Sequence, residues 1–215
     1  DSLRRKMGDQ QFLKLMSDFF AAHRTQTVTA QAFLDAASVK FALPEEMPGS
    51  MYVTSDIHSR LGSALLVYGT MADAGANRYA AEQMQRGFFR WLEHAVPIRK
   101  DFQVSEDELR THDVIFVGRP ETNSALARWQ RKLGLDSSDG LFRIDGEPYA
   151  SEANALILAA ANPEDSSRMV LIVAGNSALQ TVLSAKANLE DSRYTILESG
   201  KEVAAGFLDS VPQKR

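Results

Sequence analysis

Three strand-to-helix turns carry the residue types that could hold a small anion. Each turn begins where an apolar run ends in a glycine, at Gly69, Gly118 and Gly175, and polar residues follow before the next helical pattern. In a parallel sheet such turns lie at the carboxyl ends of the strands, which is the edge where α/β proteins bind ligands. The candidate ligand-binding residues on this edge are Thr70, Asn77, Arg78, Arg119, Asn123, Asn176 and Ser177.

These residues could bind an anionic ligand. A helix N-terminus presents free backbone N–H groups, and Arg78 and Arg119 could add contacts to a carboxylate or a phosphate. Helix capping is the competing interpretation, because Asn123 and Asn176 stand where asparagine caps a helix. Arg78 also precedes Glu82 by four residues, which is the spacing of an ordinary ion pair on a helix surface.

The sequence lacks the residues of several familiar catalytic sites. It has no cysteine, so thiolate nucleophiles, thiolate zinc sites and disulfides are excluded. Its four histidines do not form H-E-x-x-H, and the glycine turns lack the dinucleotide fingerprint and the P-loop lysine. Two short pairs could contribute metal ligands, Asp56 with His58 and His112 with Asp113, but a surface loop or a strand start explains them better. We therefore predict no catalytic residue and no metal ligand in this chain.

The composition is that of a folded domain with no strong preference for charged partners. The chain has 215 residues, of which 44% are hydrophobic and 24% charged, so a core is expected and disorder is not. A formal net charge of −4 argues against a nucleic-acid partner. The apolar runs are far shorter than the roughly 20 residues that span a bilayer, so no membrane insertion is predicted.

The elements that must position the candidate residues fall into three parts. Residues 1–42 have helical periodicity, with apolar side chains spaced three and four apart between Phe12 and Phe20. Residues 43–61 contain two prolines and a glycine before residue 52 and are predicted to be a linker. Residues 62–215 alternate strands and helices.

This alternation predicts an α/β fold of the flavodoxin-like or Rossmann-like kind, with a mainly parallel sheet and helices on both faces. The short stretch 162–167 between two apolar runs predicts one antiparallel hairpin. Ser105 and Glu108 form a capping box that should start a short helix. Strands are predicted at 63–70, 97–105, 113–120, 140–150, 154–163, 167–176 and 192–199, and helices at 77–95, 123–134, 177–188 and 201–210.

The N-terminal part resembles a known family. The stretch MGDQQFLKLMSDFF (7–20), the pair His23-Arg24, the run Thr27–Thr29 and FLDAA (33–37) resemble the closing helices of the helical domain in zinc aminopeptidases of the membrane alanyl aminopeptidase (gluzincin) family. The resemblance implies that this region packs around a catalytic domain outside this chain, where the zinc would be bound. The remainder is similar to α/β extensions that follow hydrolase domains in some bacterial proteins, which share a G-x-P-E-x-N turn matched by Gly118, Pro120, Glu121 and Asn123.

The resemblance implies a non-catalytic accessory region of a bacterial zinc metallopeptidase-like protein. Its partner would be the peptidase domain that lies N-terminal to this chain, and the zinc aminopeptidase parent would be periplasmic or secreted. Two alternatives stay open: an independent α/β enzyme or binding domain for a small anion or a nucleotide, and a scaffold that forms a homo-oligomer through the helical stripe at 12–20.

Overall fold

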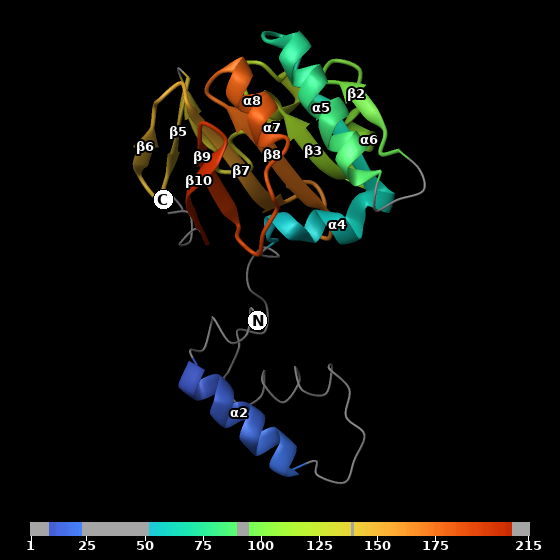
Figure 1. Cartoon of the computed structure of the whole chain (residues 1–215). Helices are drawn as coiled ribbons and strands as arrows, with labels where there is room; N and C mark the ends of the chain where they lie inside the picture. The colour runs from blue at the N-terminus through green and yellow to red at the C-terminus, as the bar shows by residue number, and fades with distance from the viewer. Residues whose placement is uncertain (1–8, 23–51, 90–94, 139, 208–215) are drawn as a thin grey trace. The chain divides into compact units, whose positions relative to one another are not determined.

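The structure is a computed structural model that describes residues 9–22, 52–89, 95–138 and 140–207. The chain divides into two compact units, Asp1–Gly49 and Ser50–Arg215, and each is described by itself. The second unit carries the α/β fold (Figure 1). None of the helices in the described ranges is long and apolar enough to cross a membrane.

The described part of the first unit is one amphipathic helix, α2 (Asp9–Ala22). Phe19 is buried and meets the ring of Phe20 edge-on, whereas Leu13 and Phe20 are exposed. The helix predicted from the apolar spacing in this region is therefore present. The second predicted helix, which starts after Thr29, lies outside the described residues.

The second unit contains a seven-stranded sheet in the order β10-β9-β7-β8-β3-β1-β2. Strands β2, β1, β3 and β8 run parallel, and β7, β9 and β10 join them through antiparallel pairs. The predicted mainly parallel sheet is thus a mixed sheet. The strands are β1 (Ala64–Tyr68), β2 (Ile98–Lys100), β3 (Asp113–Val117), β7 (Asn154–Ala161), β8 (Met169–Gly175), β9 (Tyr194–Glu198) and β10 (Lys201–Gly206).

Short connections explain the antiparallel half of the sheet. A parallel pair needs a crossover of about a dozen residues or more, which the segment between β7 and β8 does not provide. The hairpin predicted there is present, with Ala161 opposite Met169 at its closed end. The last strand corrects a second expectation, because residues 201–206 form β10 and not the start of a helix. Ser199 and Gly200 both have positive φ, 53° and 77°, which is the two-residue turn of a β-hairpin.

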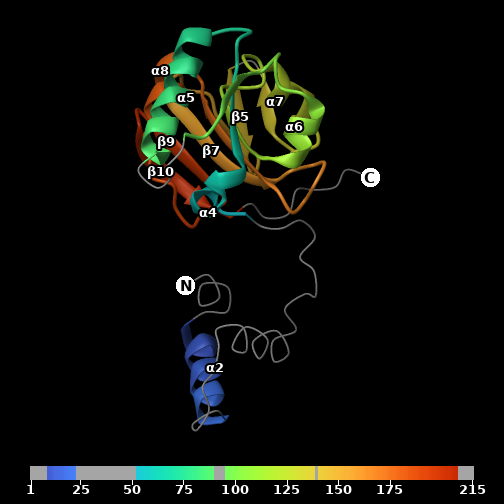
Figure 2. The same ribbon diagram turned by 90° about the vertical axis from the view of Figure 1, so that its right-hand side faces the viewer.

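Helices cover both faces of the sheet (Figures 1 and 2). On one face, α5 (Ala74–Phe88) and α8 (Ala178–Ser184) pack on side chains such as Leu66 and Ile115. On the other face, α6 (Glu106–Thr111) and α7 (Ser124–Trp129) pack on Val67 and Phe116. This second face also receives a small antiparallel sheet of β4 (Asp136–Ser138), β5 (Leu141–Ile144) and β6 (Glu147–Tyr149).

Short helical turns precede the first strand. They are η1 (Thr54–Asp56), α4 (Ile57–Arg60) and η2 (Leu61–Ser63), and Ile57 and Leu61 are buried in the core. Residues 52–61 of the predicted linker therefore belong to the folded unit. The rest of that linker, 43–51, lies outside the described residues.

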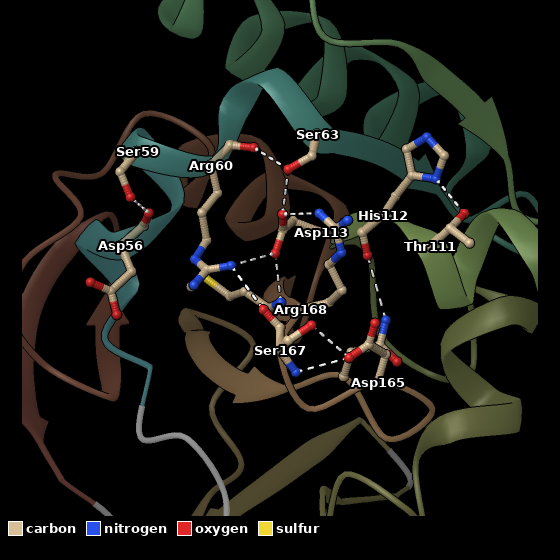
Figure 3. Close-up of polar contacts among 12 residues, drawn as sticks. Asp56, Ser59, Arg60, Ser63, Thr111, His112, Asp113, Asp165, Ser167 and Arg168 are labelled. Carbon is tan, nitrogen blue, oxygen red and sulfur yellow. Dashed lines mark hydrogen bonds and ion pairs between the residues drawn. The ribbon is translucent and has the colours of Figure 1, made fainter.

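A buried carboxylate fixes the edge of the sheet where β3 and β8 begin (Figure 3). Asp113 is fully buried, and its side chain accepts hydrogen bonds from Ser63 Oγ at 2.6 Å and from the backbone N–H of Met169 at 2.7 Å. Arg60 and Arg168 reach the same carboxylate at 3.2 and 3.5 Å. Asp113 thus joins η2, β3 and β8 through its hydrogen bonds and ion pairs.

The variant Asp113→Ala should lower the free energy of unfolding by about 3 kcal/mol, because it leaves a buried N–H and two arginines without their acceptor. Urea denaturation monitored by circular dichroism measures this change. The control is Asp107→Ala, which removes an exposed carboxylate paired with Arg110 and should change little. Equal effects of the two variants would contradict a special role for Asp113.

Candidate functional site at the carboxyl ends of the strands

The three glycine turns lie at one edge of the sheet, since β1, β3 and β8 are parallel and each turn follows its strand. The chain leaves β1 toward α5 on one face and leaves β3 toward α7 on the other. In an open α/β sheet, a reversal of this kind between neighbouring strands creates the crevice in which ligands bind. By this rule a ligand would lie between Gly69 and Gly118.

The turn that follows β3 closes this crevice. The backbone N–H of Met71 donates to the carbonyl of Thr122 at 3.0 Å, and the N–H of Gly69 donates to the carbonyl of Val117 at 3.0 Å. A Cβ added to Gly69 would lie 2.2 Å from the Thr122 carbonyl oxygen, which is far inside contact distance. Gly69 is thus required for close approach of two backbone segments, and no space for a ligand remains between them.

Two predicted site residues, Asn77 and Asn123, bind backbone groups within this crevice. The Asn77 amide donates to the carbonyls of Gly69 and Ala72 at 3.1 and 3.2 Å. The Asn123 amide donates to the carbonyls that end β1 and β3, and its oxygen accepts the N–H of Leu126. Asn123 is therefore the N-cap of α7, as the capping interpretation predicts, and both asparagines are buried.

The prediction that Asn176 caps the next helix is wrong. Its amide donates to the carbonyls of Tyr149 and Ser151, both at 2.9 Å, and so holds the end of the small sheet against β8. The N-cap position of α8 belongs to Ser177, whose hydroxyl donates to the carbonyl of Glu152 and makes no capping bond. These partners lie more than twenty residues away in the sequence, so local spacing did not reveal them.

Arg119 links the turns that follow β3 and β8. Its Nη1 donates to the carbonyl of Asn176 at 2.8 Å, and its Nη2 lies 3.9 Å from a carboxylate oxygen of Asp73. The Nε atom is buried without a hydrogen-bond partner in the described part of the chain. Much of the guanidinium of Arg119, which the sequence suggests as a contact for a carboxylate or a phosphate, is thus directed at the protein itself.

Arg78 lies elsewhere on the same edge. Its Nε donates to Glu82 at 2.8 Å, which is the predicted helix-surface pair, and the hydrogen bond and charge of Glu82 raise the pKa of Arg78. The Arg78 side chain lines a groove between α5 and β2 on which Arg119 does not border. The structure therefore does not combine the two arginines into one anion site.

A buried carboxylate that the sequence did not single out completes this edge. Asp101, directly after β2, accepts the hydroxyl of Thr70 at 2.6 Å and both the N–H and the hydroxyl of Ser124 at 2.7 and 2.9 Å. Burial acts to raise the pKa of Asp101, but the hydrogen bonds from Thr70 and Ser124 prevail and lower it. Its position at the end of a short edge strand was the only available signal. The hydroxyl of Thr70, a predicted site residue, is therefore hydrogen-bonded to Asp101.

Several of the predicted site residues at this edge, among them Thr70, Asn123 and Asn176, make intrachain hydrogen bonds. Among the residues that the structure describes, no group of three or more histidines, aspartates and glutamates could hold a metal ion. His58 and His112 lie at the opposite edge of the sheet, with His58 against Phe88 and His112 beside Glu108. No known family model matches the sequence, and a search of curated proteins finds no match.

Replacing Gly69 tests the closed crevice. The variant Gly69→Ala should lower the free energy of unfolding by about 2 kcal/mol or more, because the new methyl group meets backbone that cannot move aside. Thermal and urea unfolding measure the change. The matched control is Gly75→Ala in α5, where the added methyl meets nothing within 4 Å and should stabilise the helix by about 0.5 kcal/mol. A neutral Gly69→Ala would show that the crevice has room.

The charge of Asp101 should appear in the pH dependence of stability. The pKa of Asp101 is lower in the folded state than in the unfolded state. The ionised carboxylate therefore contributes fully to the free energy of unfolding above the unfolded-state pKa, and this contribution is lost as the pH falls through the folded-state pKa. We expect the free energy of unfolding of the wild type to fall below about pH 4 more steeply than that of Asp101→Asn. Parallel pH profiles for the two proteins would contradict this assignment.

Proposed function

We propose that this chain is a non-catalytic accessory region of a zinc metallopeptidase-like hydrolase and packs against the catalytic domain of that protein. One observation carries the proposal: the crevice between β1 and β3, where an α/β enzyme would hold its substrate, is filled by the turn that contains Thr122. A domain with its usual ligand position closed is suited to a structural role.

The disposition of the buried polar groups supports the same conclusion. Asp101 and Asp113 are the buried carboxylates of the described residues, and hydrogen bonds from neighbouring groups occupy both. A general acid or base must instead be able to reach a substrate proton. Neither carboxylate therefore has the position that catalysis would require.

The resemblance of residues 7–37 to the helical domain of the gluzincin aminopeptidases supports the choice of partner. A helix such as α2, with Leu13 and Phe20 exposed, is stabilised mainly by what packs on its apolar side. In this proposal the zinc and the peptidase chemistry belong to the catalytic domain alone. We also propose that the α/β domain is Rossmann-like or flavodoxin-like. The parallel strands β2-β1-β3-β8 and the helices on both faces of the sheet support this.

The exposed apolar side chains of α2 are also consistent with the alternative role, a scaffold that forms a homo-oligomer. That role predicts a dimer or larger species whose association is lost in Phe20→Glu, whereas the accessory role predicts a monomer until the peptidase domain is supplied. Light scattering on the full chain and on Phe20→Glu separates the two.

Two measurements test the accessory role. The purified chain, with zinc added, should not hydrolyse aminoacyl chromogenic substrates, and the reading frame upstream of Asp1 should encode H-E-x-x-H with a downstream glutamate. When that upstream region is expressed with a tag, it should co-purify with the untagged chain. Turnover by the chain alone, or an upstream region without the zinc motif, would contradict the proposal.

A further inference from the structure

A groove lies between α5 and the edge strand β2, beside the closed crevice. These two elements are neighbours in Figure 1, and the groove between them has a volume of about 520 Å³. It is larger than a single phosphate or carboxylate group requires. Its polar lining includes Tyr68, Arg78, Glu82, Arg86, Lys100 and Gln103.

The groove carries an excess of positive charge. Arg78, Arg86 and Lys100 line it, and Glu82 is its only acidic lining residue among those described. This local excess contrasts with the net charge of −4 of the whole chain. An anion that approaches the protein is therefore attracted here more than to the average surface.

Glu82 pairs with only some of the nitrogen atoms of the neighbouring arginines. Its carboxylate lies 2.8 Å from Nε of Arg78 and 3.6 Å from one terminal nitrogen of Arg86. The two terminal nitrogens of Arg78 have no hydrogen-bond partner among the described residues. Lys100 has no carboxylate partner in the same ranges, and its ammonium lies 5.6 Å from the ring centre of Phe102.

Neutral donors stand next to these cations. Tyr68 ends β1 with its ring buried, and it lines the groove together with Gln103 from the segment after β2. A hydroxyl and an amide beside several cations form hydrogen bonds to the oxygens of phosphate and carboxylate groups. The groove also lies toward the carboxyl end of β2, where α/β sheets present ligand sites.

We propose that this groove binds a small polyanion, a molecule with two or more phosphate or carboxylate groups. The groove exceeds the size of one anionic group and its cations come from both α5 and β2, which favours a ligand with more than one such group. The inference goes beyond the accessory role and does not depend on it.

Calorimetric titration of the full chain at low ionic strength tests the groove, with pyrophosphate and citrate as separate probes. We expect saturable binding at one site per chain, weakened by about tenfold in Lys100→Gln and in Arg78→Gln through loss of a charge-assisted contact. The matched control is Arg128→Gln on α7, an exposed arginine paired with Glu106, which should bind as the wild type does. Preference for pyrophosphate or for citrate identifies the anionic group.

Absence of saturable binding for both probes would overturn the proposal, and so would equal weakening by Arg128→Gln, since that indicates general attraction to charge. Circular dichroism shows whether each variant is folded. Chemical-shift changes upon titration should include the side-chain amide of Gln103, and shifts confined to other regions would also contradict the site. These results are distinct from peptide turnover or a missing zinc motif, which bear on the accessory role alone.

Discussion

The close contact between Gly69 and the turn at Thr122 determines how this domain is built. It requires a residue without a side chain at the end of β1, and it brings the turn after β3 onto the strand next to it. Asn123 then reaches the carbonyls of both strands while it starts α7. Because Ser124 follows directly, the same turn supplies the donors that hold Asp101. One backbone contact thus connects three neighbouring strands at their carboxyl ends.

Buried carboxylates at opposite edges stabilise the parallel half of the sheet. Asp101 joins the ends of β1 and β2 to the start of α7, and Asp113 joins the beginnings of β3 and β8 to η2. Each carboxylate is surrounded by donors that offset its desolvation, as buried charge requires. The carboxylates of Asp101 and Asp113 are both engaged in hydrogen bonds that link elements of the fold. Charged donors also lie at the periphery of the sheet, where Arg78, Arg86 and Lys100 line the groove between α5 and β2.

The sequence predicted the features that depend on near neighbours. The capping box of Ser105 and Glu108, the cap at Asn123, the pair of Arg78 with Glu82 and the β7–β8 hairpin are all present, because each follows from a spacing of a few residues. The partners of Asn176, Asp101 and Asp113 come from distant segments, so periodicity could not identify them. The strand β10 was missed because its alanines suit a helix, whereas the hairpin turn before it and pairing with β9 decide the outcome.

The protein itself closes the crevice between β1 and β3. Hydrogen exchange of individual backbone amides, followed by NMR, measures whether this crevice opens. The N–H groups of Met71 and Ser124, which bond across the crevice to Thr122 and Asp101, should exchange as slowly as amides in the central strands. Fast exchange at Met71 and Ser124, comparable to that of exposed loops, would show a crevice that opens and would contradict the account.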